Sequence, residues 1–408
     1  MFSRRLPWDS PENALAAAEA ACRQAGGAVL DLTVSNPTAV ELPYPVAALR
    51  EALALSEVAT YAPSPRGLPS ARAAIAADYA RRGCAVEPDH LLLTASSSES
   101  YALLFKLLCD PGDAVMVPEP SYPLFDYLAR LEGVQPWAYR LAYDGVWHVD
   151  FASIEAALAG ARVAGQKLRA LIVVSPNNPT GSFLKTDEHR RLAALCAHAG
   201  LALIADEVFA DFPFGDAPPD AVACAATAAA GDDAPPLTFS LGGLSKSCGL
   251  PQLKLGWIVA GGSPPDVSAA ALARLELIAD TYLSVATPVQ LAAPRLLALG
   301  GTIRAAIAAR VAGNRARLQA LLPASSPCTL LPAEAGWSAI LRVPAVLTDA
   351  EWAVTLLRRD GVLVQPGYFF DLPGPGAYVV VSLLPPSSIF AEAVARVVDR
   401  CSRSGEGS

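Results

Sequence analysis

Short runs of apolar residues alternate, through the middle of the chain, with longer stretches in which apolar side chains recur every three or four positions. The apolar runs are Leu91–Thr94, Ala114–Val117, Leu171–Ser175, Leu201–Ala205 and Leu237–Ser240. The periodic stretches are Glu99–Leu108, Pro123–Leu131, Ile154–Ala161 and Glu188–Ala199. Continuous apolar runs are typical of parallel strands buried on both faces, and the stretches between them predict crossover helices. The pattern predicts the α/β class.

The pattern changes after about residue 290. A long helix rich in Ala, Arg and Leu is expected over Ala293–Leu322, followed by short strands near Trp337–Arg342 and Tyr378–Leu383 and by a final helix. This order favours a second, smaller α+β domain. The first 50 residues are expected to join it, because the parallel-strand pattern starts only later. The sequence therefore predicts a large domain over residues 51–288 and a smaller part made of an N-terminal arm, residues 1–50, and residues 289–408.

The composition narrows the classes of protein to which the chain can belong. Of its 408 residues, 53% are hydrophobic and only 17% are charged, which excludes general disorder. The net charge is −8 without a long basic stretch, so neither nucleic acid nor an anionic membrane is expected as a partner. No unbroken apolar stretch of about 18 residues predicts a membrane span. The N-terminus shows no apolar leader and the eight cysteines form no C-x-x-C pair, so a reducing, cytoplasmic location is expected.

Four motifs at the ends of expected strands carry polar side chains suited to chemistry. They are the serine run at 96–98, Asn178 in a turn rich in Pro and Gly, Asp206, and Lys246 in a loop of small residues. The carboxyl ends of parallel strands form the edge at which α/β folds bind ligands. Hydroxyls and free backbone N–H groups at a helix start also suit a phosphate. Each motif alone has a structural interpretation too, as a loop lysine, an ordinary turn or a helix cap.

Taken together, the motifs resemble those of the class I and II aminotransferases, which are fold-type-I enzymes that use pyridoxal 5′-phosphate. The resemblance spans nearly the whole chain and includes Tyr61-Ala62-Pro63, Gly67-Leu68-Pro69 and the segment 111–123. It implies a large domain with a mainly parallel, seven-stranded sheet between helices. It also implies small-molecule substrates, an amino donor and a keto acid, and a homodimer that shares its active sites.

The resemblance implies a role for each matching residue. Lys246 would hold the cofactor as an internal aldimine and carry the proton between the substrate Cα and the cofactor. Asp206 would pair with the protonated ring nitrogen, and Asn178 would donate to the ring O3′ and contact the substrate. Further cofactor contacts are implied for Tyr122 on the ring face, for Ser97, Ser98, Ser245 and Lys254 around the phosphate, and for Tyr61, which would reach the phosphate from the neighbouring subunit.

Two departures from the family pattern concern the cofactor. Phe209 stands where the family usually has a tyrosine, so a hydroxyl donor to O3′ is missing. Lys254 stands where the family usually has an arginine at the phosphate. A lysine supplies charge but not the bidentate fork of a guanidinium.

The substrate side departs further. Val380 matches the place of the arginine that binds the substrate α-carboxylate in the family, and a valine cannot offset the cost of desolvating a carboxylate. Either another cation takes over, with Arg342, Arg4 and Arg5 as candidates, or the substrate presents no carboxylate there. Ser35 matches a substrate-contacting glycine, so its side chain narrows or polarises the pocket.

Three functions are weighed on this basis. The first is an aminotransferase that works by a ping-pong mechanism through the Lys246 aldimine. The second is a lyase, decarboxylase or biosynthetic synthase of the same fold, because those reactions use the same electron sink. The third is a cofactor-binding protein that acts as a sensor or scaffold. Lys246→Ala separates the third from the others, and dependence on a keto acid separates the first from the second.

Overall fold

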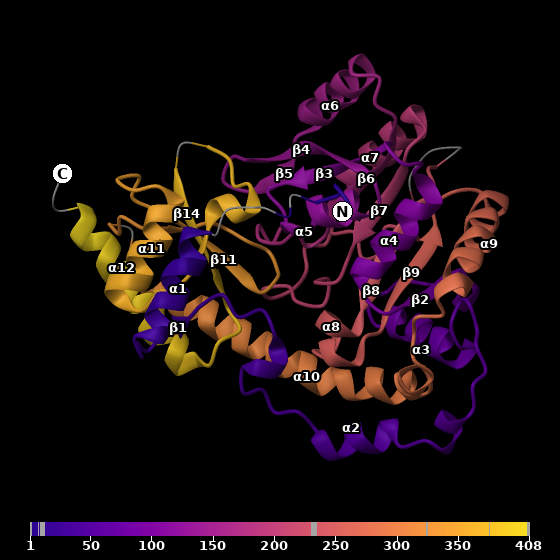
Figure 1. The fold of residues 1–408 in the computed structure, drawn as a ribbon, viewed down its shortest axis with the longest axis horizontal. Helices are drawn as coiled ribbons and strands as arrows, with labels where there is room; N and C mark the ends of the chain where they lie inside the picture. Colours follow the sequence, from indigo (N-terminus) through magenta and orange to yellow (C-terminus); the bar gives the residue numbers. More distant parts are fainter. Residues whose placement is uncertain are drawn as a thin grey trace.

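The larger of the sheets contains eight strands and forms the body of the molecule (Figure 1). A computed structural model describes residues 2–6, 8, 13–229, 235–323, 325–374 and 376–405. In spatial order the strands of this sheet are β2 (Leu91–Thr94), β9 (Gly256–Gly261), β8 (Thr238–Gly243), β7 (Ala202–Asp206), β6 (Leu168–Val174), β3 (Ala114–Glu119), β4 (Gln135–Tyr143) and β5 (Trp147–Val149). The five strands from β8 to β4 are parallel, whereas β9 is antiparallel to both of its neighbours.

Helices cover both faces of this sheet. One face packs against α4 (Ser97–Leu108), α5 (Leu124–Leu131) and α9 (Pro265–Tyr282). The other face packs against α6 (Phe151–Val163) and α7 (Thr186–Ala199) near β3, β6 and β7, and against α3 (Pro69–Ala80) and α10 (Thr287–Ala320) near β2 and β9. Leu171, Leu203 and Phe239 are fully buried, as parallel strands covered by two helical layers require.

The smaller part is built on an antiparallel sheet with the order β10 (Thr329–Leu330), β11 (Ser338–Val343), β14 (Ala377–Ser382) and β13 (Gln365–Pro366). Beside it, β1 (Leu30–Asp31) pairs in parallel with β12 (Val362–Leu363). The helices of this part are α1 (Ala14–Gln24), α11 (Asp349–Asp360) and α12 (Ser387–Gly405). The remaining short elements are α2 (Val46–Leu53), α8 (Leu244–Ser247) and five 3-10 turns: Pro37–Ala39, Ser56–Ala59, Pro88–His90, Pro251–Leu253 and Gly367–Phe370.

The longest helix, α10, runs beneath both parts and contacts α2, α3 and α12 (Figure 1). Within the described residues it is the one helix long and apolar enough to cross a bilayer by length and composition alone. The core helix of a soluble protein passes the same test, and α10 buries Leu296, Ile303, Ile307 and Leu318 against its neighbours.

The predicted α/β fold is confirmed, with one addition. The seven expected strands of the large sheet are present, and β5 adds a three-residue eighth strand as the antiparallel partner of β4 at one edge. The pairing of β1 with β12 joins residues 30–31 to the C-terminal part, while α2 packs against α10. The boundaries at residues 50/51 and 288/289 stay a prediction.

The loop of residues 333–335, before β11, packs against the loop that contains Gly181, after β6. The two loops are so close that Gly181 has no room for a side chain. The carboxylate of Glu334 accepts a hydrogen bond from Phe183 N and pairs with the ammonium of Lys185. A Cβ at Gly181, where φ is +71°, would lie within 2.3 Å of the carbonyl oxygen of Ala335. These contacts fix the place from which the next residues of the chain, Trp337 and Ser338, reach the edge of the large sheet.

Candidate active site

A cavity of about 210 Å³ lies at the carboxyl edge of the large sheet, where the small sheet faces it. Both sheets contribute to its walls, as α/β folds with a ligand at this edge require. Eight of the residues predicted for the site line this cavity: Ser35, Ser97, Ser98, Tyr122, Asn178, Asp206, Phe209 and Lys246. The structure thus brings together side chains that span more than 200 positions of the sequence.

Lys246 extends into the cavity from α8, which directly follows β8. Burial lowers the pKa of this amine to about 8, although the nearby carboxylate of Asp206 acts in the opposite direction. Its Nζ also lies 5.3 Å from the ring centroid of Phe209 and 4.9 Å from that of Trp337. A primary amine with a pKa near 8 is partly unprotonated at neutral pH, so it can act as a nucleophile and as a base.

Asp206 ends β7 and is buried. Its Oδ2 accepts a hydrogen bond from the hydroxyl of Tyr101 at 3.0 Å, and its Oδ1 accepts one from Val208 N at 3.2 Å. Burial raises the pKa of Asp206, while these two donors and the charge of Lys246 stabilise the carboxylate form. A buried carboxylate with two donors and one cation nearby is suited to hold a protonated ring nitrogen.

The adjacent carboxylate, Glu207, has a different role. Its Oε1 accepts hydrogen bonds from Ser240 Oγ at 2.6 Å and from Ala225 N at 2.7 Å, and Glu207 does not line the cavity. Burial raises the pKa of Glu207 to about 7. Of the two consecutive carboxylates, only Asp206 therefore faces the candidate site.

Asn178 is oriented by a residue of the small sheet. The hydroxyl of Ser338, on β11, donates to Asn178 Oδ1 at 3.1 Å. Because the amide oxygen is engaged, the amide NH2 group remains as the donor for a ligand in the cavity. Asn178 follows β6 in a loop that contains cis peptide bonds at Ser175–Pro176 and Asn178–Pro179.

The serine run opens α4. Ser96 is the N-cap, and its Oγ accepts a hydrogen bond from Glu99 N at 3.2 Å. The cap role thus falls on Ser96, so Ser97 and Ser98 present their hydroxyls and the first-turn N–H groups at the cavity. A helix N-terminus of this kind binds anions, and phosphate in particular.

Ser245 and Lys254 do not line the cavity. Gly243 pairs with Gly256, and Leu244 N donates to Leu255 O, so Ser245 and Lys254 flank the end of the β8–β9 pair. A Cβ at Gly256 would lie only 3.0 Å from the carbonyl carbon of Ser96, so β9 and the start of α4 are in direct contact. Lys254 is exposed and adopts a left-handed conformation with φ of +51°.

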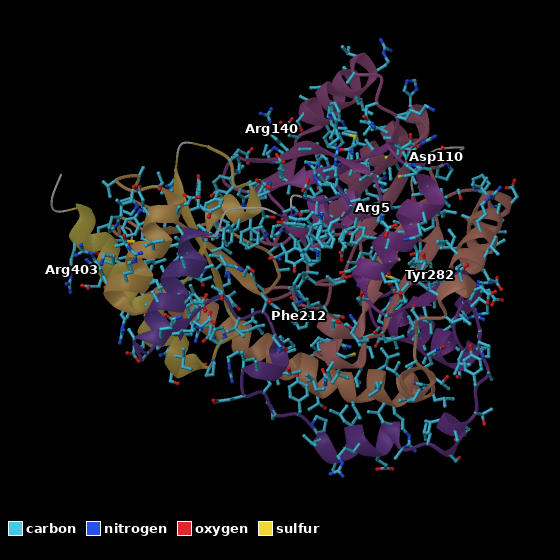
Figure 2. The ribbon with its side chains drawn as sticks, viewed as in Figure 1. Arg5, Asp110, Arg140, Phe212, Tyr282 and Arg403 are labelled. Carbon is cyan, nitrogen blue, oxygen red and sulfur yellow. The ribbon has the colours of Figure 1, made fainter. Side chains whose placement is uncertain are left out.

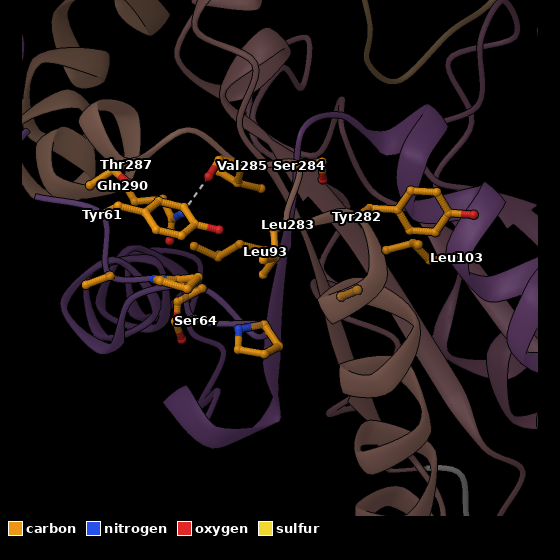
Figure 3. Close-up of a pocket in the computed structure, with 15 residues that line it drawn as sticks. Tyr61, Ser64, Leu93, Leu103, Tyr282, Leu283, Ser284, Val285, Thr287 and Gln290 are labelled. Carbon is orange, nitrogen blue, oxygen red and sulfur yellow. Dashed lines mark hydrogen bonds between the residues drawn. The ribbon is translucent and has the colours of Figure 1, made fainter.

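Two further predicted residues, Tyr61 and Arg342, also do not line the cavity. Tyr61 is 77% exposed and lines a separate pocket with Tyr282 and Gln290 (Figure 3). Arg342 is exposed on β11, four residues beyond Ser338, which is about 13 Å along a strand. The structure therefore does not bring Arg342 to the cavity, contrary to the prediction. Ser338, on the same strand, does line it.

The two N-terminal arginines are also absent from the cavity walls. Arg5 donates through Nη1 to the carbonyl of Leu131, the last residue of α5, at 2.7 Å (Figure 2). This contact places a cation at the C-terminal end of a helix, where it is electrostatically favourable. The opposite end of α5, with Leu124 and Phe125, is the one that lines the cavity.

Sequence reasoning missed several residues of the site. Tyr101 follows Ser97 by four positions, so helical periodicity places both on one face of α4, and this signal was available. Trp337 packs edge-on against Phe209 and against Phe212, which lies in the middle of the molecule (Figure 2). Ser338, Gln365 and Ser382 line the cavity from the small sheet. No motif marks these three, because only the packing of the two sheets brings them to the edge.

Residues 28–380 match the family model for aminotransferase class I and II. The chain belongs to the class I and II aminotransferases. The cofactor of this family is pyridoxal phosphate, and the residues present fit it: an amine of lowered pKa, a buried carboxylate with two donors, and a helix start with free N–H groups share one cavity. Among the described residues no cluster of His, Cys, Asp and Glu suits a metal ion.

Individual proteins are more distantly similar. A valine–pyruvate aminotransferase of Mycobacterium tuberculosis is 29% identical over 393 residues, which are 94% of this chain and 93% of that protein. A tyrosine aminotransferase of Homo sapiens is 29% identical over 235 residues, 57% of this chain, and the match spans 49% of that protein. An S-alkyl-thiohydroximate lyase of Arabidopsis thaliana is 25% identical over 355 residues, 84% and 73% of the two chains.

The solved structures agree on the fold. An alanine aminotransferase from Pyrococcus furiosus superimposes with a TM-score of 0.83 and 23% identity, over 99% of this chain and 100% of that chain. An aminotransferase from Escherichia coli superimposes with a TM-score of 0.82 and 23% identity, over 98% of each chain. At this level of identity the likeness establishes the fold-type-I architecture.

Tyr101→Phe tests the part of Tyr101 in holding the cofactor. Loss of the hydroxyl leaves Asp206 with one donor fewer and raises its pKa further, which favours the uncharged acid that cannot pair with a protonated ring nitrogen. A hydrogen bond to a charged group contributes about 1.5–3 kcal/mol, so the dissociation constant for pyridoxal phosphate should rise roughly 10- to 100-fold. Titration of the apoprotein with the cofactor measures this constant.

Tyr139→Phe is the matched control. Tyr139 is as buried as Tyr101, and its hydroxyl donates to the carbonyl of Ile172 at 2.8 Å, on the other face of the sheet. The control should bind the cofactor within about twofold of the native protein. Equal affinities for Tyr101→Phe and the native protein would contradict the role of Tyr101.

Proposed function

We propose that the protein is a pyridoxal-phosphate-dependent aminotransferase that moves an amino group between an amino donor and a carbonyl acceptor by a ping-pong mechanism. The main observation behind the proposal is that Lys246 and Asp206 line one cavity. The charge of each residue influences the pKa of the other. The family match and the full-length relative, which is a valine–pyruvate aminotransferase, support the reaction class.

The residues of the cavity have different roles in the proposed reaction. Bound pyridoxal phosphate supplies an aldehyde for the amine and a conjugated ring that accepts the electron pair of the substrate Cα. When pyridoxal phosphate is bound, Asp206 would hold the proton at the ring nitrogen, Ser97 and Ser98 would bind the phosphate, and Lys246 would hold the aldehyde. Once free, the Lys246 amine, whose pKa burial lowers, would accept the substrate Cα proton and return it.

A lyase of the same fold is the second candidate. The relative from Arabidopsis thaliana is named a lyase, and it matches more of this chain than the human tyrosine aminotransferase does. Lyases share the lysine and the carboxylate, so the cavity alone does not separate the two reactions. They differ in the fate of the amino group, which a transaminase retains on the cofactor and a β-lyase releases as ammonia.

Single-turnover measurements test the proposal. The holoprotein is mixed with primary amines, amino alcohols and amino acids without an acceptor, and both the visible cofactor band and the carbonyl product are followed. At least one donor should change the band and give one carbonyl product per site, with no ammonia or carbon dioxide released. Lys246→Ala should give less than about a thousandth of this rate, because its amine both binds the cofactor and moves the proton.

Two other outcomes would end the proposal in different ways. Release of ammonia and pyruvate, or of carbon dioxide, from the native protein would establish the lyase or decarboxylase instead. A holoprotein in which no donor changes the band would point to a cofactor-binding protein without turnover.

We also propose that the active sites are completed in a homodimer. Tyr61 is the basis of this proposal, because its side chain is exposed in the single chain and lines the same pocket as exposed Tyr282, on the opposite side of it (Figure 3). The pocket between them is shaped by Gln290, whose Nε2 donates to Val285 O at 2.8 Å and whose Oε1 accepts from Leu68 N at 2.7 Å. A second copy that covers this surface would bring Tyr61 to the phosphate of the other subunit.

Mixed dimers test this arrangement. Lys246→Ala and Tyr61→Ala subunits are each expected to be nearly inactive as homodimers. When the two are unfolded together and refolded, or coexpressed, the mixed dimer should contain one intact site and recover a substantial part of native activity per intact site. If Tyr61 acts within its own chain, mixing restores nothing, and a monomer in sedimentation experiments would also contradict the proposal.

A further inference from the structure

The face of the small sheet that looks toward the large sheet presents three rows of side chains. The row nearest Lys246 is the cross-strand pair Ser338 and Ser382, and both of these serines line the cavity. The next row contains Val380, with Ile340 opposite it on one side and Gln365 on the other. Directly opposed side chains lie about 4.5–5.5 Å apart at Cβ, so Gln365 and Val380 are immediate neighbours.

The third row contains Arg342, the candidate cation for a substrate carboxylate. Arg342 pairs there with Tyr378, two residues further from the cavity than Val380 along β14, and it is exposed to solvent. Val380 itself is 1% exposed and packs in an apolar cluster with Ile340 and Phe370. Of the middle row, Gln365 lines the cavity and places one neutral amide there, while Ile340 and Val380 are buried in the apolar cluster.

Both charged side chains on the cavity wall belong to the proposed cofactor site. Among the described residues that line the cavity, Lys246 is the one cation and Asp206 the one anion. Both belong to the cofactor end, where Lys246 would hold the aldehyde and Asp206 would pair with the ring nitrogen. A substrate carboxylate at the small-sheet end would lose water without gaining a counter-charge from this chain, which disfavours its binding in a buried site.

Neutral hydrogen-bonding groups remain at this end. Ser35 and Gln365 line the cavity, and neither side chain hydrogen-bonds to another described residue. The other three hydroxyl groups there are occupied as donors: Ser382 Oγ donates to Val34 O at 2.6 Å, Thr33 Oγ1 donates to Asp31 Oδ1 at 2.6 Å, and Ser338 Oγ donates to Asn178 Oδ1 at 3.1 Å. The free set therefore offers an amide and a hydroxyl, each able to donate and accept.

We propose that this subsite, formed by Ser35, Gln365 and the Ser338–Ser382 pair, binds a neutral hydrogen-bonding group of the substrate, such as a hydroxyl or carboxamide, in place of a carboxylate. The substrates are then amino alcohols or amino amides with an apolar arm, which Leu124, Leu128 and Phe370 accommodate, and the matching ketones. This inference rests on the proposed aminotransferase function and names its substrate class.

Atoms and electrons balance in the transfer of the amino group in the same way as they do for an amino acid. The donor gives up its C–N bond, and its amino-bearing carbon is oxidised by two electrons to a carbonyl whose oxygen comes from water. The amino group and the two electrons pass to the bound cofactor, which returns them to a ketone in the second half of the cycle. Because both halves use one subsite, hydroxyketones should be better acceptors than 2-oxo acids.

A matched series of donors tests the proposal. L-Phenylalaninol, L-phenylalaninamide and L-phenylalanine are compared in single turnover with the native holoprotein, and the rate constant divided by the apparent dissociation constant is obtained for each. The alcohol or the amide should exceed the acid by at least 100-fold. A preference for the acid overturns this inference but leaves the aminotransferase intact, whereas a protein that transfers from none of the panel of donors described above fails at the proposed function.

Substitutions of Gln365 give a second, independent test. Gln365→Leu should lower the rate constant divided by the apparent dissociation constant for L-phenylalaninol about 10-fold or more. It should leave the affinity for pyridoxal phosphate unchanged. Gln365→Arg adds the missing cation beside Val380. It should shift the preference for L-phenylalanine over L-phenylalaninol, measured as the ratio of their rate constants divided by apparent dissociation constants, by at least 10-fold toward the acid. Gln319→Arg, an exposed position on α10, is the control for added charge and should shift nothing. A Gln365→Arg protein that binds the cofactor normally with an unchanged ratio would contradict the subsite.

Discussion

The structure depends above all on holding a carboxylate and an amine, Asp206 and Lys246, in one partly dehydrated cavity. Burial disfavours the charge on both, and it lowers the pKa of Lys246 to about 8 while raising that of Asp206. The fold offsets this cost for Asp206 with the hydroxyl of Tyr101 and the N–H of Val208. Parallel strands make the arrangement possible, because β7 and β8 end at the same edge of the sheet and so deliver both residues to it.

The second constraint is the contact between the two sheets. Ser338 binds Asn178, Ser121 N donates to the carbonyl of Phe370, and the close approach at Gly181 fixes the loop that carries Trp337. Through these contacts the small sheet forms one wall of the cavity and orients a cofactor-side amide. The small sheet, which contains the proposed substrate subsite, therefore also orients Asn178, so substitutions at this contact should affect both ends of the cavity.

Much of the cofactor end could be predicted from the sequence, because motifs at strand ends carry it. Asp206, Lys246, Asn178 and the serines of α4 each follow an apolar run, and the order of the strands brings them together. The strands β4 and β9 were harder to detect. β4 lies near one edge of the sheet and alternates in exposure, and β9 is a short antiparallel strand directly after the lysine loop.

The substrate end could not be predicted in the same way. Arg342 was a candidate cation on an expected strand of the smaller domain, but the cross-strand register places it in the third row, away from the cavity. Gln365 carries no motif and becomes a neighbour of Val380 only through the β13–β14 pairing. Register between distant strands depends on tertiary packing, which a local pattern does not contain.

Reduction of the holoprotein with borohydride, followed by peptide mapping, tests the central claim most directly, since it fixes bound pyridoxal phosphate to the amine that holds it. The account predicts the added mass on the peptide that contains Lys246, one per chain, and no such peptide from Lys246→Ala. A label on another lysine, such as Lys254, or no label on a protein saturated with cofactor, would contradict the account.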